Sequence, residues 1–334
     1  MSIDNQVDIS RNPKIDAMRG TAIFMVVLGH SIIYYPINLH EVAWCQNLFL
    51  LLSSVHMPLF FLLSGFCYQY KGTYKEYITN KIKRLMIPYL IFNLLDIAPR
   101  ALFTGLVNRN RDVGSSIRRI IFNGGEYWFL YTLFLIFCFF PFVAVFVKRG
   151  RVAGLVVAAL TVCIRIVGTQ TEILCVNQVC IYLVFFYLGY SVRIYQNSLR
   201  SLCIKVKERM GSERYIFYIL LILVIFCAWA LDIGRFRLGG LVISLMGILV
   251  CYAMSGWNWF EKILVRFGKY SLPIYLLNEY MLVISRTFVC KILQVDNPAF
   301  IICFNMLVDF IVSYLFIKYV CCKIKIGRIV LGMG

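Results

Sequence analysis

Residues 11–31, RNPKIDAMRGTAIFMVVLGHS, change from a basic, polar segment into an apolar run. The run carries Asp16 and Arg19 at its start and His30 deep inside it. About twenty apolar residues in a helix are enough to cross a ~30 Å hydrocarbon core. Polar side chains inside such a helix face partners or a water-filled cavity, and they usually mark a functional site. The stretch therefore predicts a membrane helix that takes part in a site.

Similar apolar stretches recur along the whole chain, which has 334 residues, 61% of them hydrophobic and only 15% charged. This composition is too apolar for a soluble domain. It predicts an all-α, polytopic integral membrane helical bundle of about ten transmembrane helices. We expect one membrane-embedded domain over residues 1–334, with a short cytoplasmic tail at 1–14, no soluble domain and no cleavable signal peptide. The predicted spans are 15–36, 48–70, 86–107, 126–147, 152–168, 173–192, 214–232, 237–255, 271–290 and 298–317.

The chain has a net charge of +18. Lys and Arg on cytoplasmic loops orient a membrane protein, and we favour this explanation over binding to nucleic acid. Most Lys and Arg fall on the segments that are cytoplasmic if both termini lie inside the cell, so we predict both termini there. The outer loop 108–125 carries four arginines against this bias. Two interpretations stay open, namely binding of an anionic glycan or lipid phosphate, and capping with surface salt bridges. The thirteen cysteines lack C-x-x-C spacing, so we expect packing residues and no metal site.

Arg19 and His30 lie on one stripe of the first predicted helix. They are eleven residues apart, so they differ by only about 20° around the helix and by ~16 Å along it. His56 lies ~12 Å deep in the second span, which enters from the opposite side, so the two histidines are at similar depth. Glu126 begins the fourth span at the outer edge. We predict one polar cavity lined by His30, His56 and Glu126, with Arg19 at its cytoplasmic mouth.

These residue types suit acyl transfer from an anionic thioester. A neutral imidazole is a good general base near pH 7, and a basic mouth attracts an anion. Residues 74–90 have the spacing of an amphipathic surface helix, whose Lys81 and Arg84 could meet phosphates beside Arg19. The ~16 Å between Arg19 and His30 is comparable to an extended pantetheine arm. A proton relay would also place His and Glu in a membrane, and His56, just before Pro58, could instead bond a carbonyl freed by that proline.

Five motifs in this order resemble the acyltransferase-3 family of integral membrane acyltransferases. IDAMRGTAIFMVVLGHS resembles the first-helix signature of Arg-Gly and, after ten intervening residues, His; VHMPLFFLLSGFCY resembles the second-helix signature ending in Ser-Gly-Phe. KIKRLMIPYL resembles the cytoplasmic Arg-x-x-Arg element, with Lys81 in place of the first Arg. YWFLYTLF resembles the Trp-Phe-Leu motif. FGKYSLPIYLLNEY, residues 267–280, resembles the late Gly-x-x-Ser-x-x-x-Tyr-Leu-x-His motif, with Asn278 in place of His. VVLGHS together with HMPLFF is most similar to the fucose 4-O-acetylase-like branch.

The resemblance implies roles for particular residues. His30 would be the catalytic histidine, and we add Glu126 and His56 as candidate catalytic groups. Acyl-CoA would be held by Arg19, Lys81 and Arg84, with Asp16 beside them. The candidate substrate-binding residues are Trp128, Tyr275 and Asn278. An Asn cannot act as a base, so any role of position 278 is hydrogen bonding.

The resemblance also implies transfer of acetyl from acetyl-CoA, as co-substrate and without a metal, to a sugar hydroxyl of a cell-surface polysaccharide or its lipid-linked precursor. The expected partners are acyl-CoA, a carbohydrate acceptor, membrane lipid and polysaccharide assembly machinery, and the expected location is the inner (plasma) membrane. A longer donor such as succinyl-CoA stays open. The rival classes are a glycan or lipid transporter or flippase and a non-catalytic assembly partner. A transporter should show internal repeats or paired broken helices, and none is evident in the sequence.

Overall fold

The computed structural model of the chain describes residues 12–33, 39–102, 113–168, 171, 173–198, 201, 218–225, 237–255 and 258–333. Every regular element in these ranges is helical, which confirms the predicted all-α class. The long helices are α1 (Pro13–Ile33), α2 (Ala43–Phe66), α4 (Ile87–Leu102), α6 (Trp128–Val147), α7 (Arg151–Val167), α8 (Val176–Ile194), α11 (Arg237–Met254), α13 (Ser271–Thr287) and α14 (Pro298–Tyr319). The shorter ones are α3 (Tyr74–Lys81), α5 (Val113–Asn123), α12 (Asn258–Lys269) and α15 (Lys325–Val330), with single turns at Leu39–Glu41, Ile82–Met86, Ile173–Cys175, Phe288–Ile292 and Cys321–Lys323.

Within the described ranges, five helical segments are long and apolar enough to cross a membrane. The chain is therefore a helical membrane protein. A helix also occupies each predicted span except 214–232, of which only residues 218–225 are described, and these are helical. The five segments are Pro13–Ile33, Ala43–Phe66, Gly114–Val147, Ile173–Ile194 and Pro298–Lys323.

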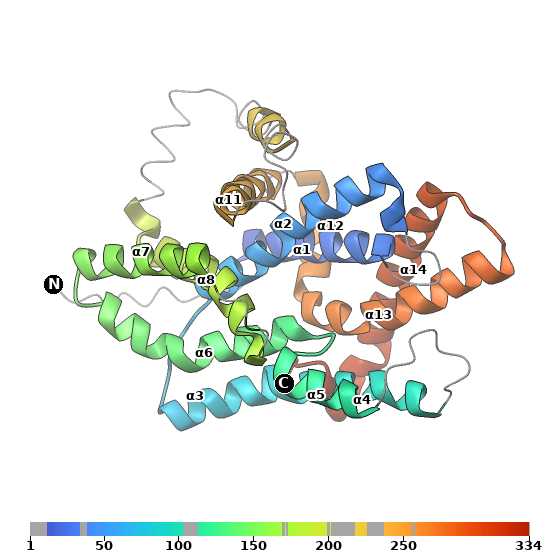
Figure 1. The fold of residues 1–334 in the computed structure, drawn as a ribbon, viewed down its shortest axis with the longest axis horizontal. Coiled ribbons are helices and arrows are strands. Elements are labelled where there is room, and N and C mark those ends of the chain that lie inside the picture. The colour runs from blue at the N-terminus through green and yellow to red at the C-terminus, as the bar shows by residue number, and fades with distance from the viewer. Residues whose placement is uncertain are drawn as a thin grey trace.

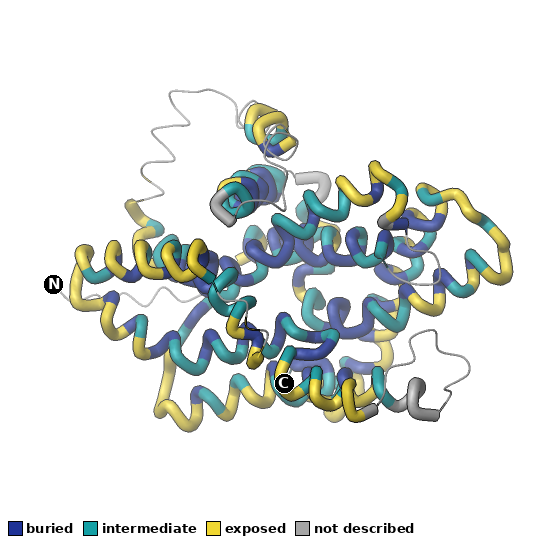
Figure 2. The backbone as a smooth tube through the Cα atoms, in the orientation of Figure 1, coloured by how far each residue is buried: buried dark blue, intermediate teal, exposed yellow. Residues whose placement is uncertain are grey.

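Helix α1 lies at the centre of the bundle (Figure 1). It packs most extensively against α12 and α2 and also contacts α13 and α14. Its residues are mostly buried, whereas α3, α7 and the outer turns of α14 carry the exposed surface (Figure 2). The helix begins at Pro13, two residues before the predicted span, because the Asn12 side chain accepts a hydrogen bond from the Lys14 amide at 3.0 Å and Pro13 occupies the first helical position. The helix that carries Arg19 and His30 is thus enclosed by four others.

Glycines allow the helices around α1 to approach closely. A Cβ at Gly268 of α12 would lie 1.7 Å from the carbonyl oxygen of Asp16, and one at Gly20 would lie 2.0 Å from that of Leu264. The contact between α2 and α8 is as tight, since a Cβ at Gly65 would lie 1.9 Å from a backbone oxygen of α8. These glycines stand in the motifs quoted above. Their physical role is backbone-to-backbone packing, because only a residue without a side chain fits at these positions.

Two segments differ from the sequence prediction. Residues 108–125 and 256–270 lie between predicted spans, but they contain the amphipathic helices α5 and α12. Each is too short and too charged to cross a membrane. Neither helix contains a long apolar run, so hydropathy alone does not indicate it. The predicted surface helix at 74–90 is present as α3, which a capping box between Thr73 and Glu76 begins and a π-turn at Ile82–Met86 follows.

Candidate active site

The side chains of His30 and Asn278 meet where α1 packs against α13. Asn278 Nδ2 lies 2.5 Å from His30 Nδ1. The Asn278 side chain is fully buried, and His30 is half-buried. Two further contacts hold α13 in place on either side of Asn278. The Tyr127 hydroxyl donates to the Leu276 carbonyl at 3.1 Å, and the buried Arg286 guanidinium donates to the carbonyl of Ser31, the residue next to His30.

His56 is close enough to His30 for a charge on one ring to act on the other. The sequence predicted that the two rings lie at similar depth. His56 is 6% exposed, and its Nδ1 lies 2.7 Å from the carbonyl oxygen of Leu52. Because a carbonyl only accepts, His56 carries a proton on Nδ1, and the lone pair of the neutral ring is on Nε2. A general base needs this tautomer when it reacts through Nε2.

The carbonyl freed by Pro58 is not the partner of His56. Proline at position 58 removes the amide that would bond the carbonyl four residues earlier, at Ser54. The hydroxyl of Ser244, on α11, lies 2.6 Å from the Ser54 oxygen and 2.7 Å from its own-helix Gly240 oxygen, and it can donate to either. The alternative explanation of His56 as the group that bonds the freed carbonyl is therefore wrong.

An aromatic contact places His56 and Asn278 at one level. Phe60 lies one turn after His56 on α2, and Tyr275 lies one turn before Asn278 on α13. Both rings have their centroids 5.7 Å from that of Phe129 on α6. The charges of Glu126 and Glu279 also act on Tyr275. Tyr275, a predicted substrate-binding residue, is thus one turn from Asn278, which meets His30.

Basic side chains that the sequence singled out gather at the other end of α1. Arg19 Nη1 lies 3.5 Å from the Asp16 carboxylate, and its Nη2 lies 3.3 Å from the Cys67 sulfur. Asp16 is 4% exposed, so its position fits orientation of Arg19 rather than contact with an anion. Cys67 directly follows the Ser-Gly-Phe motif at the end of α2, and sequence reasoning did not find it.

Lys81 and Arg84 complete this cluster. The charge of Arg19 acts on Arg84, and that of Arg84 acts on Lys81. The Lys81 ammonium also lies 3.9 Å from the centroid of the Phe137 ring. Burial lowers the pKa of Lys81 to about 8, and the Arg84 charge acts in the same direction. We call Arg19, Cys67, Lys81 and Arg84 the basic cluster.

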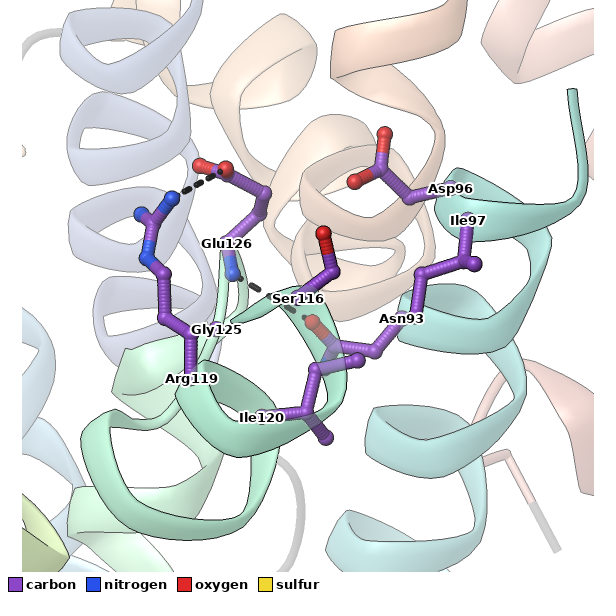
Figure 3. Close-up of a pocket in the computed structure, with 8 residues that line it drawn as sticks. All are labelled: Asn93, Asp96, Ile97, Ser116, Arg119, Ile120, Gly125 and Glu126. Carbon is purple, nitrogen blue, oxygen red and sulfur yellow. Dashed lines mark hydrogen bonds and ion pairs between the residues drawn. The ribbon is translucent and has the colours of Figure 1, made fainter. Parts of the chain in front are cut away.

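Glu126 forms an ion pair with a residue of α5. Its Oε1 lies 2.9 Å from Arg119 Nη1, and its amide donates to Asn93 Oδ1 at 3.3 Å (Figure 3). These groups line a cavity of about 20 Å³, which has room for one water. For Arg119 the salt-bridge explanation of the basic outer loop is thus the one observed. Arg109 and Arg111 lie outside the described residues.

The third predicted substrate-binding residue, Trp128 of α6, lies near the face of α2 that is opposite to His56. Its ring stacks on Tyr182 at 5.6 Å, and Tyr182 lines a second cavity of about 230 Å³ together with Ser54, Pro58 and Arg165. His56 is two residues from both Ser54 and Pro58, so its side chain projects to the opposite face of the helix. The structure brings His30, His56 and Asn278 together and leaves Trp128 beside the second cavity.

Comparison with known families assigns the chain. The family model described as an acyltransferase domain, of the acyltransferase-3 type, matches residues 12–321. The chain belongs to the acyltransferase-3 family. No curated protein and no solved structure matched the chain.

The family match makes this chain a membrane acyltransferase and favours the enzyme class over the transporter and assembly-partner alternatives. The described cysteines of the acyltransferase are free thiols. Its described residues contain no group of three His, Cys, Asp or Glu side chains that could hold a metal ion.

Proposed function

We propose that this acyltransferase moves acetyl from cytoplasmic acetyl-CoA to a sugar hydroxyl of a cell-surface polysaccharide or its lipid-linked precursor. One observation carries the proposal. A single buried helix holds Arg19 of the basic cluster near one end and His30, eleven residues on, near the other. The rise of ~16 Å suits an extended pantetheine arm, with its nucleotide phosphates at the cluster and its thioester at the histidine.

The proposed chemistry is direct transfer with His30 as general base. His30 takes the proton of the sugar hydroxyl as that oxygen attacks the thioester carbonyl carbon. The carbon–sulfur bond then breaks, and the proton passes to the departing CoA sulfur. The products are the sugar ester and free CoA. Arg19, Lys81 and Arg84 contribute charge for the phosphates, and Asp16 orients Arg19.

The acceptor is proposed from the motifs. VVLGHS and HMPLFF support the fucose 4-O-acetylase-like branch, and with it a carbohydrate. The excess of Lys and Arg on one set of loops supports the basic cluster facing the cytoplasm. The family resemblance supports location in the inner membrane. Membrane lipid and polysaccharide assembly proteins are the proposed neighbours.

The test follows labelled acetyl from acetyl-CoA into the glycan fraction of membranes that contain the acyltransferase. We expect transfer by the wild type and a loss of about 10²- to 10⁴-fold in His30→Ala. His40→Ala, at the remaining histidine of the chain outside the predicted stripe, is the matched control and should transfer normally. Equal transfer by wild type and His30→Ala would remove His30 from the chemistry. Transfer of succinyl but not acetyl would replace the donor.

A further inference from the structure

A histidine base that reacts through Nε2 must hold its other proton on Nδ1. His56 meets this condition through its own helix, because the Leu52 carbonyl accepts from Nδ1. At His30 a side chain of another helix lies at Nδ1, because Asn278 Nδ2 is 2.5 Å from that nitrogen. Which amide atom residue 278 presents to Nδ1 therefore bears on the tautomer of His30.

We propose that Asn278 is the positioning residue of the base. In the reacting state its amide oxygen accepts Nδ1–H of His30, which leaves the lone pair of the neutral ring on Nε2. This inference rests on the proposed function, in which His30 takes the hydroxyl proton. It adds the group that decides which nitrogen does so, at the position where the late motif of the family commonly has His.

The amide can present its oxygen without loss of another hydrogen bond. Nδ2 occupies the place beside His30 Nδ1, while Oδ1 is buried and finds no partner among the described residues. A half-turn of the amide exchanges the two atoms, and the only bond it breaks is the one it replaces. When His30 becomes an imidazolium, both ring nitrogens carry protons and only the oxygen can stay at Nδ1.

The surroundings explain why a neutral acceptor stands here. A carboxylate at a fully buried intramembrane position is expensive, whereas an amide oxygen accepts without charge. The contacts of α13 at Leu276 and Arg286 hold the position of Asn278 against α1 from both sides. The site thus holds the acceptor at a fixed place and leaves its amide able to turn.

Substitutions at 278 separate positioning from packing. Asn278→Leu keeps the size and removes the acceptor, so kcat should fall about 10- to 100-fold while KM for acetyl-CoA stays within about threefold. Asn278→Asp has the same shape and keeps an oxygen that accepts Nδ1–H, so its kcat should stay well above that of Asn278→Leu. Asn305→Leu is the matched control. Asn305 is also fully buried, and it bonds Ser285 of α13 at 2.6 Å, about two turns along that helix from Asn278. Its kcat should stay near that of wild type.

The tautomer itself can be measured by ¹⁵N NMR of the purified full-length acyltransferase. The chain has only three histidines, so ¹⁵N-histidine labelling gives three rings, and His30 is assigned by its loss in His30→Gln. We expect Nδ1 of His30 to be protonated and Nε2 not, with the reverse or a mixture in Asn278→Leu. A proton on Nε2 in the wild type with bound CoA, or a loss of kcat in Asn278→Asp equal to that in Asn278→Leu, would overturn the proposal.

These results are separable from the test of function. If His30→Ala still transferred acetyl, the proposed base would fail whatever tautomer the ring adopts. If His30→Ala lost transfer, but Asn278→Leu changed neither the tautomer of His30 nor kcat, His30 would remain the base. The role of Asn278 alone would then fail.

Discussion

At the scale of single residues, Lys81 gives the acyltransferase a pH dependence. Burial and the Arg84 charge depress its pKa from 10.5 to about 8. The ammonium is therefore present below about pH 8 and is lost as the pH rises through that value. If Lys81 binds CoA phosphates, KM for acetyl-CoA should rise by up to about tenfold between about pH 7 and pH 9, a loss of roughly 1.4 kcal/mol of binding.

The control for this prediction is Lys81→Arg, which also restores the Arg-x-x-Arg pattern of the family. An arginine stays charged throughout this range. Its KM for acetyl-CoA should therefore be nearly constant from about pH 7 to about pH 9 when assayed beside the wild type. The same rise in both proteins would show that another group titrates, and would contradict the assigned role of Lys81.

The sequence predicted the ends of the site better than its interior. Arg19 and His30 are related by helix geometry within one segment, so their shared stripe followed from spacing alone. The contact between His30 and Asn278 joins residues 248 positions apart, and only the packing of α13 on α1 brings them together. Cys67 was missed for the same reason, since its neighbours Arg19 and Lys81 belong to other helices.

At the scale of helices, Gly268 should be intolerant of a methyl group. A Cβ there would lie 1.7 Å from the Asp16 carbonyl oxygen, and the backbone of α1 cannot yield without moving Arg19. Gly268→Ala should lower the free energy of unfolding by about 1–3 kcal/mol. It should also raise KM for acetyl-CoA. Thermal unfolding in detergent, followed by tryptophan fluorescence, and acetyl-CoA titrations measure the two effects.

Gly154 of α7 offers the matched control. A Cβ at Gly154 would meet nothing closer than 3.5 Å, an ordinary contact distance. Alanine is favoured over glycine inside a helix by up to about 1 kcal/mol. Gly154→Ala should therefore leave the unfolding temperature unchanged or raise it. Equal unfolding temperatures for Gly268→Ala and wild type would mean that α12 moves away from α1 at little cost.

Helices were predictable where they are apolar and long, and harder to predict where they are short. α1, α2 and α6 follow from uninterrupted apolar runs. α5 and α12 alternate charged and apolar residues over about three turns, and their stability comes from packing on the bundle rather than from hydropathy. Of the two, α12 matters most for the site, because it packs on the α1 segment that carries Asp16 and Arg19.

At the scale of the whole molecule, the bundle class followed from composition, but the arrangement around α1 did not. Apolar runs specify that helices form, whereas their neighbours depend on small residues such as Gly20 and Gly65 that carry little signal by themselves. The orientation prediction rests on the excess of Lys and Arg on one set of loops. Both termini, the α6–α7 turn and the basic cluster should then lie on the cytoplasmic side.

Cys67 makes this orientation measurable together with the donor site. Cys67 is a partly exposed residue within the basic cluster. A membrane-impermeant maleimide should therefore label it in inverted inner-membrane vesicles and not in right-side-out ones. Cys67→Ser, measured in parallel, subtracts the labelling of the other twelve cysteines.

Acetyl-CoA should slow this labelling, because phosphates held by Arg19, Lys81 and Arg84 would cover the thiol. Labelling only from the outer side would reverse the topology and move the donor site away from cytoplasmic CoA. Labelling from the inner side that acetyl-CoA does not slow would support the predicted topology. It would also show that the CoA nucleotide does not bind at the basic cluster. The side from which Cys67 is labelled tests the orientation that the charge of the loops predicts. Protection by acetyl-CoA tests whether the contacts at the end of α1 form the nucleotide site.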